Sequence, residues 1–185
     1  GAARPHYRRH GFWLVVITTV LYLPLLGSYS LSDPWETHYG EVAREMLSRD
    51  DWISLWWAQE GWFWSKPILD FWIQGVFFSA LGVRYMPDQM LAAAAHGRFP
   101  QPEWAARVGV FLLTVLGVYF LYKGVAKACG RRAGLLGGIV LTTMPYWYLI
   151  AHQSMTDMLY VAPLTAAMGL ALLAFHTPAT QTVRV

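Results

Sequence analysis

The sequence is poor in charged residues and in cysteine. It holds 14 Lys and Arg and 11 Asp and Glu among 185 residues, and 56% of its residues are apolar. Cys129 is the single cysteine, so no internal disulfide can form and cysteine usage does not indicate a redox compartment. These shortages exclude a disulfide-rich scaffold, and the apolar composition excludes a disordered chain.

Long stretches lack charge altogether. Residues 11–32 form a run of 22 without an acid, Lys, Arg or His, and residues 108–122, 133–151 and 158–175 form runs of 15, 19 and 18. About 20 apolar residues cross a bilayer core, whereas apolar stretches of about 10–14 are typical of core helices in soluble proteins. The runs therefore exclude a soluble domain and predict an all-α, polytopic membrane protein.

The basic residues lie at the ends of these runs. Arg4, Arg8 and Arg9 precede the first run, and residues 123–132 hold four basic residues and no acid, whereas residues 33–60 hold seven acids against two arginines. Membrane topology explains this distribution, so the net charge of +3 does not indicate nucleic-acid binding. The positive-inside rule places both basic segments in the cytoplasm and the acidic segment outside.

A fifth apolar stretch, 67–83, decides the topology. It contains Asp70, and its uncharged part of 13 residues suits an interfacial or re-entrant helix better than a span. If it lies at the interface, every strong charge signal agrees and both termini are cytoplasmic. We predict four spans, near residues 11–31, 104–122, 133–151 and 158–175, with an exoplasmic loop at 32–103.

The ends of the chain indicate a piece of a larger protein. The sequence begins with Gly-Ala-Ala-Arg rather than Met and stops shortly after the last predicted span. The first run is too long for a signal-peptide core and has no small-residue cleavage site after it, so it is predicted to stay as an anchor. We expect residues 1–185 to be one transmembrane module, with the remainder of the same chain as its partner.

The exoplasmic loop opens with a helix signature. Asp33 is expected as the N-cap, Pro34 at the first helical position and Glu36 as the second half of a capping box. Apolar residues then recur at helical spacing: Trp35, Tyr39, Val42 and Met46. The pattern predicts an amphipathic helix over 34–48 that lies along the membrane surface.

Tryptophan is concentrated in the next segment, with six between residues 52 and 72. Tryptophan gathers at the headgroup level, where one edge is apolar and the N–H meets water. The segment is therefore either an aromatic belt or a wall for a lipid or sugar ligand, and the two are compatible. The candidate lipid or sugar contacts are Trp62, Trp64, Tyr39 and His152.

Acids and one lysine are expected on the same side of the membrane. A carboxylate can accept the proton of an attacking hydroxyl or amine, and a cation can neutralise a phosphate leaving group. Transfer from a lipid-phosphate donor needs both. The candidate catalytic residues are Asp33, Glu36 and Asp157, and the candidate phosphate-binding residues are Lys66 and Arg44; carboxylates near a phosphate could also hold a divalent metal ion.

Structural roles are open for the same residues. Asp33, Glu36 and Asp157 could serve only as helix caps, Lys66 could reach up to lipid headgroups, and His152 could be an interfacial histidine. At the level of the whole chain, the alternative to an enzyme is a non-catalytic membrane subunit or a transporter fragment. The acids lie at the ends of spans rather than at mid-bilayer, which disfavours transport.

The order of these landmarks resembles the GT-C superfamily of membrane glycosyltransferases, in particular the branch of aminoarabinose lipid A transferases and protein O-mannosyltransferases. The resemblance covers residues 10–175. It rests on the run DPWETHYGEVAREML at 33–47, Asp51-Trp52-Ile53, Lys66-Pro67-Ile68, Arg107 within EWAAR, GRRAGLL at 130–136 and Met155-Thr156-Asp157.

This resemblance implies a multi-pass enzyme of the bacterial inner membrane with its active site on the exoplasmic (periplasmic) side. It implies an inverting transfer of a sugar from a polyprenyl-phosphate donor to a lipid A-type lipid, a protein or a glycan, and no nucleic-acid partner. It implies that an acid near the end of the first span is catalytic or metal-associated and that Asp157 corresponds to the second-loop acid.

The sequence departs from the branch at two points. The branch commonly has adjacent Asp-Glu before Thr-x-Tyr, whereas here Trp35 precedes Glu36, so either Asp33 or Glu36 takes the role of the acid. The branch often has an acid before Lys-Pro, where this chain has Ser65, so no metal ligand is assigned and the cofactor is left unknown.

Overall fold

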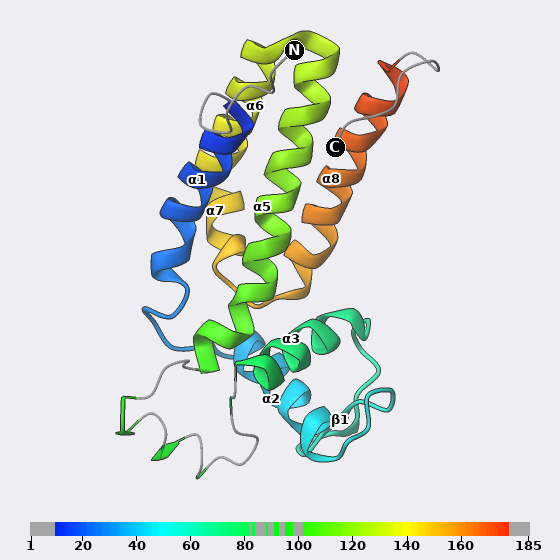
Figure 1. Cartoon of the computed structure of the whole chain (residues 1–185). Coiled ribbons are helices and arrows are strands. Elements are labelled where there is room, and N and C mark those ends of the chain that lie inside the picture. Colours follow the sequence, from blue (N-terminus) through cyan, green and yellow to red (C-terminus); the bar gives the residue numbers. More distant parts are fainter. Residues whose placement is uncertain are drawn as a thin grey trace. The chain divides into compact units, whose positions relative to one another are not determined.

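The computed structural model describes residues 10–81, 83, 88, 91–92, 95–97 and 102–177. The N-terminal arginines and several residues between 82 and 101 lie outside this part. The elements, coloured along the chain in Figure 1, are α1 (His10–Tyr22), η2 (Leu23–Leu25), α2 (Trp35–Ser48), β1 (Trp56–Trp57), β2 (Gly61–Trp62), α3 (Leu69–Ala80), α5 (Pro102–Cys129), α6 (Arg131–Thr143), α7 (Pro145–Ala151) and α8 (Thr156–Phe175). The predicted helical class is confirmed, with one short antiparallel hairpin as an addition.

The chain divides into two compact units. The first, here the helical unit, comprises Gly1–Leu23, Leu112–Ala151 and Asp157–Val185; the second, here the loop unit, comprises Pro24–Phe111 and His152–Thr156. The first turns of α5 thus belong to the loop unit, as does the segment between α7 and α8.

The four predicted spans are not confirmed. By length and hydropathy, α5 and α8 are able to cross a membrane within the described part of the chain, and α6 with α7 would make a third span if the bent pair counts as one. The predicted span at 104–122 extends further, because α5 continues through the basic segment to Cys129 and only Gly130, with φ +93°, separates it from α6.

The first apolar run is helical over only part of its length. Its helix, His10–Leu25, is shorter than a span, and residues 26–31 leave the helix although they carry no charge. Pro24 has no N–H to donate and Gly27 and Ser28 favour a turn. Residues 26–31 are uncharged, so the charge-free run alone does not distinguish them from the helix, and the predicted span of 11–31 is too long.

The third apolar run bends instead of crossing straight. Met144 has an extended backbone (φ −65°, ψ 123°) between α6 and α7, and the two helices differ in direction by 62°. Pro145 explains the break, because the proline ring excludes the helical conformation at the preceding residue and suits the first position of a new helix.

Polar contacts join α1 to α6 within the helical unit. The Thr18 hydroxyl lies 3.2 Å from that of Thr142, and the Tyr22 hydroxyl donates to the Thr142 carbonyl at 2.6 Å. Gly138 faces the Leu14 side chain, so the two helices approach closely at this level.

Glycines set the approach of α5 to α8. A Cβ on Gly117 would lie 3.1 Å from the Ala162 carbonyl oxygen, while Gly124 and Gly169 face the backbone of the opposite helix so closely that a methyl group would collide with it. Small residues at helix contacts are typical of membrane proteins, since packing there depends on close backbone approach.

The loop unit is built on α2 and α3. The predicted helix at 34–48 is confirmed as α2, and Tyr39, Val42 and Met46 of its predicted stripe are buried against Phe71 and their neighbours, whereas Trp35 is exposed. The apolar face of α2 therefore packs on protein; its contact with a membrane surface stays a prediction.

The predicted interfacial helix at 67–83 corresponds to α3, which is shorter, with 12 residues from Leu69 to Ala80. It is not among the described helices that could span a membrane by length and hydropathy. Its Ile73 and Phe77 side chains pack against Gly109 in the first turns of α5, where a Cβ would collide with Ile73.

The close contact between α5 and α8 predicts that a larger residue at Gly169 lowers the stability of the protein. Gly169→Ala adds a methyl group against the Phe120 carbonyl, and overpacking of this kind costs roughly 1–3 kcal/mol. Gly137→Ala in α6 is the matched control, because nothing lies within 4 Å of the added Cβ and alanine stabilises a helix. Thermal unfolding in detergent should show a lower midpoint for Gly169→Ala alone; equal midpoints would contradict the close contact.

Candidate functional site

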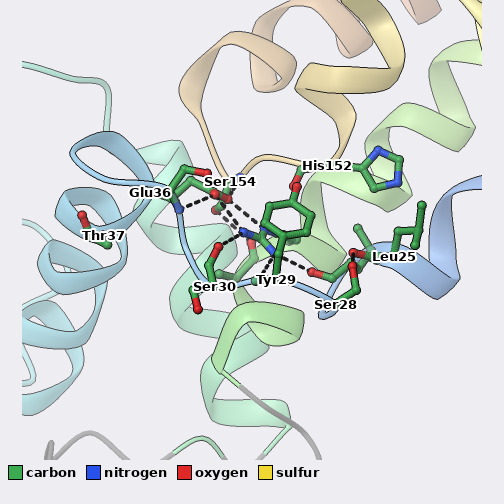
Figure 2. Close-up of polar contacts among 12 residues, drawn as sticks. Leu25, Ser28, Tyr29, Ser30, Glu36, Thr37, His152 and Ser154 are labelled. Atoms are coloured by element: carbon green, nitrogen blue, oxygen red, sulfur yellow. Dashed lines mark hydrogen bonds and ion pairs between the residues drawn. The ribbon is translucent and has the colours of Figure 1, made fainter. Parts of the chain in front are cut away.

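A buried carboxylate organises the loop unit. Glu36, in the first turn of α2, is fully buried and accepts four hydrogen bonds. Its Oε1 accepts from Arg107 Nε at 2.9 Å and from the Ser154 backbone N–H at 2.6 Å; its Oε2 accepts from Arg107 Nη2 at 2.8 Å and from the Ser32 N–H at 2.9 Å. Figure 2 shows Glu36 and Ser154 converging on these contacts.

The partner, Arg107, comes from α5 and is also fully buried. Besides Glu36 it binds three carbonyl oxygens of the non-helical segment after η2: Nη1 donates to Leu26 at 2.7 Å and to Tyr29 at 2.9 Å, and Nη2 donates to Ser30 at 3.0 Å. Its guanidinium carbon lies 4.0 Å from the centre of the Tyr29 ring. All five N–H groups of a guanidinium are thereby used.

The segment between α7 and α8 is held by the same cluster. The Tyr29 hydroxyl donates to the His152 carbonyl at 2.6 Å, and the Ser154 hydroxyl donates to the Ala106 carbonyl at 2.9 Å. We call Glu36, Arg107 and Ser154, with the carbonyls that they fix, the Glu36–Arg107 cluster. It joins four parts of the sequence: residues 26–32, α2, the start of α5 and residues 152–156.

The electrostatics of the cluster keep Glu36 ionised. Burial alone would raise the pKa of its carboxyl group, but hydrogen bonds from Arg107, Ser154 and Ser32 and the Arg107 charge together lower it below 4.5. A carboxylate with a lowered pKa and four donors around it is a weak proton acceptor. The chemical role of Glu36 in this structure is to hold other groups in place.

Asp33 differs from the prediction made for it. Pro34 takes the N-cap position of α2 without a side-chain cap bond, so Asp33 does not cap the helix. The Glu36 carboxylate accepts from the Ser32 N–H. In the expected capping box it would accept from the N–H of Asp33, one residue later. Asp33 is exposed, and among the described residues its hydrogen-bond partner is the Thr37 hydroxyl, 3.0 Å from Oδ1.

The two predicted phosphate ligands have different surroundings. Lys66 is half-buried and has no hydrogen bond or ion pair with any part of the chain that the structure describes. Arg44 binds Glu41 at 2.6 Å and also Glu45, both on its own helix. Lys66 therefore carries the more available positive charge.

The predicted ligand contacts are also divided. Trp62 and Trp64 are 51% and 74% exposed, whereas Tyr39 is 3% exposed and packs edge-on against Phe71 in the core. His152 is buried beside the Glu36–Arg107 cluster, where its carbonyl is used by Tyr29. The two tryptophans are open to a ligand and the tyrosine is not.

Asp157 is exposed in the first turn of α8. It belongs to the helical unit, one residue beyond the end of the loop unit at Thr156. A carboxylate in a first helical turn is stabilised by the helix dipole, which agrees with the expected structural role and leaves its catalytic role a prediction.

No group of three or more His, Cys, Asp or Glu side chains converges within the described residues.

Arg107 belongs to the family pattern in the sequence, but its residue type and local pattern assign it no function of its own. The available signal was its position. An arginine at the sixth position of an apolar helix is costly in lipid, so it predicts a buried partner. Its partner Glu36 lies 71 residues away, which no local pattern reveals.

Asp70 forms a second buried polar group. It is 2% exposed, its Oδ1 accepts from Gln74 Nε2 at 3.1 Å, and its Oδ2 and the Gln74 Oε1 have no partner among the described residues. Burial raises the pKa of its carboxyl group to about 6, and the Gln74 hydrogen bond only partly opposes this. The residue faces the protein interior rather than water or lipid.

The fold places the chain in a known class. The chain superposes on the crystal structure of ArnT from Cupriavidus metallidurans bound to undecaprenyl phosphate with a TM-score of 0.74, at 24% identity, over 91% of this chain and 28% of that one; the structure of its apo state gives the same values. This is the fold of the GT-C membrane glycosyltransferases, as the landmarks in the sequence indicated.

Residues 89–182 match the family described as dolichyl-phosphate-mannose-protein mannosyltransferase, and the chain belongs to that family. Two curated relatives are undecaprenyl phosphate-alpha-4-amino-4-deoxy-L-arabinose arabinosyl transferases. The one from Edwardsiella ictaluri is 27% identical over 85% of this chain, and the one from Pectobacterium carotovorum is 30% identical over 84%. The chain spans about a quarter of the length of these relatives.

The Glu36–Arg107 pair predicts a large stability effect. Arg107→Met leaves Glu36 buried without its counter-ion, which costs roughly 3–5 kcal/mol of unfolding free energy. Arg131→Met, at an exposed arginine, should change it by less than about 0.5 kcal/mol. Denaturant unfolding in detergent measures both, and equal stability of the two variants would refute the assigned role of Arg107.

The raised pKa of Asp70 predicts that the free energy of unfolding falls as pH rises, which is the opposite of what an ion-paired acid gives. Its folded pKa of about 6 lies above the reference value of 3.8, so the folded state binds more protons between these values and the free energy of unfolding falls as pH rises through this window. Asp70→Asn should remove that slope, whereas Glu60→Gln, at an exposed turn, should retain it. The measurement is thermal unfolding between pH 4 and 7, which covers most of this window. An unchanged slope in Asp70→Asn would contradict the raised pKa of Asp70.

Proposed function

We propose that this chain forms the N-terminal part of an integral-membrane glycosyltransferase that takes its sugar from a polyprenyl-phosphate donor. The observation that carries the proposal is the shared fold, over 91% of the chain, with a transferase whose structure contains undecaprenyl phosphate. The relatives named above are arabinosyl transferases that use an undecaprenyl-phosphate-linked sugar, and the membrane helices suit a lipid-borne donor.

The reaction needs one proton acceptor and one cation. A hydroxyl of the acceptor attacks the anomeric carbon, its O–H proton passes to a carboxylate, and the bond from that carbon to the phosphate oxygen breaks with inversion. Polyprenyl phosphate leaves with the electron pair of that bond. The acceptor is a lipid A-type lipid, a protein or a glycan.

Asp33 serves as the proton acceptor in this proposal. Its carboxylate is exposed and bonded to Thr37 through one oxygen, which leaves the other oxygen open to an acceptor hydroxyl. Glu36, the alternative, is excluded from water and has four donors around its two oxygens. These surroundings favour Asp33 over Glu36, so Asp33 is the acid in this proposal.

Lys66 binds the phosphate of the donor. Its ammonium group has no partner within the described residues, so binding a phosphate breaks no existing ion pair. A cation there neutralises the charge that develops on the leaving phosphate. Arg44 would take part only by exchanging one of its two carboxylate partners.

The Glu36–Arg107 cluster positions the site. It fixes three carbonyls between residues 26 and 30 and the Ser32 N–H, directly before Asp33, and it holds Ser154 three residues before Asp157. Asp157 assists at the acceptor side in this proposal, and the exposed Trp62 and Trp64 line the approach of lipid or sugar. In this proposal the acidic loop faces the exoplasmic side of the bacterial inner membrane. The basic segments that flank the spans support this topology through the positive-inside rule.

The test is turnover of the complete enzyme with donor and acceptor. Asp33→Asn removes the proton acceptor and should lower kcat by about 10²-fold or more with donor binding retained. Lys66→Gln should chiefly raise the KM for the donor, because it removes the charge that binds the phosphate. Glu60→Gln is the control on an exposed acid of the same loop. Wild-type turnover in both Asp33→Asn and Lys66→Gln would overturn the assignment of these residues.

A further inference from the structure

The β1–β2 hairpin has two aromatic faces. Side chains alternate between the faces of a strand, so Leu55, Trp57 and Phe63 share one face. Leu55 and Phe63 are buried, Trp57 stacks on His38 with ring centres 3.8 Å apart, and Phe63 meets Phe71 edge-on at 5.6 Å. This inner face closes the core of the loop unit.

The opposite, outer face is also aromatic. Trp56 pairs with Trp62 across the strands, their rings edge-on at 5.1 Å, and Trp64 stacks on Trp62 at 6.4 Å. Trp62 is half-exposed and Trp64 is three-quarters exposed, and Ile53 nearby in the chain is equally open. We call Trp56, Trp62 and Trp64 the outer tryptophan face. Apolar surface of this kind on a folded unit marks a contact site.

One cation is built into this face. The guanidinium carbon of Arg49 lies 4.7 Å from the centre of the Trp56 ring and 5.4 Å from that of Trp62. The aromatic rings hold the arginine side chain, and Arg49 is exposed, so its guanidinium is accessible to a phosphate. The outer tryptophan face thus combines apolar rings with a positive charge.

The structure ties this face to a membrane-crossing helix. α5 is a candidate span, and its Gly109 packs against Ile73 and Phe77 of α3. α3 in turn holds the hairpin segment, because the Trp72 indole N–H donates to the Trp52 carbonyl at 2.6 Å. All of these contacts lie in the loop unit, so that unit contains both the start of a span and the hairpin.

We propose that the outer tryptophan face of the hairpin lies in the headgroup layer of the bilayer, with the Arg49 guanidinium bound to lipid phosphate. Indole rings favour this layer because they are apolar with one polar N–H, and Arg49 complements an anionic headgroup. The adjoining turn, residues 58–60, is exposed and carries Glu60, so the face rather than the tip of the hairpin enters the layer.

The experiment measures the depth of a spin label in vesicles. Trp64→Cys is made in the complete protein with Cys129 and any further native cysteine replaced by serine, then labelled with a nitroxide and reconstituted in phosphatidylethanolamine and phosphatidylglycerol vesicles. We expect the label to collide with oxygen several-fold more than with a water-soluble nickel complex. Gln59→Cys in the exposed turn is the matched control and should show the reverse preference.

Two results would overturn the proposal. One is equal nickel accessibility of the labels at positions 64 and 59. The other is a position-64 label that is open to nickel in vesicles and becomes shielded on addition of a soluble sugar, which would make the face a carbohydrate surface. Trp62→Cys gives a second reading on the same face, and thermal unfolding checks that each labelled variant keeps the wild-type fold.

Discussion

The ion pair between Glu36 and Arg107 is the constraint on which the loop unit depends. Removing two charges from water is expensive, and it is offset only when nearly every donor and acceptor finds a partner. Here the guanidinium uses all five N–H groups and the carboxylate accepts four hydrogen bonds. The three carbonyls that Arg107 binds belong to a segment that has left the helix, so the arginine replaces the donors that a helix would have supplied.

This arrangement divides the work between two acids three residues apart. Glu36 points into the protein, where its charge is fully compensated and its pKa is lowered. Asp33 is exposed and accepts a hydrogen bond from the Thr37 hydroxyl through Oδ1, which leaves Oδ2 accessible. A rigid buried pair next to an accessible group is a common design of reactive sites, because the reacting group must be both positioned and reachable.

The elements with strong periodicity could be predicted from the sequence. The apolar spacing and capping residues located α2 within one residue, and the uncharged runs located α5 and α8. Hydropathy failed where a proline interrupts an apolar run, at Pro24 and Pro145, since lipid-like composition continues while the helix does not. Residue type alone supplied the candidate site residues, and two of them, Tyr39 and Arg44, are engaged in the fold, one in the core and one by neighbouring carboxylates.

The sequence by itself determined the membrane class, the helical composition and the family, because charge-free runs and the order of motifs are properties of the chain alone. Only the tertiary structure decided which acid is buried. Glu36 and Arg107 are separated by 71 residues, and their burial follows from the packing of α2 on the start of α5. The same packing sorts the tryptophans of one hairpin into an inner and an outer face, since alternation along a strand fixes opposite sides but not which side meets the core.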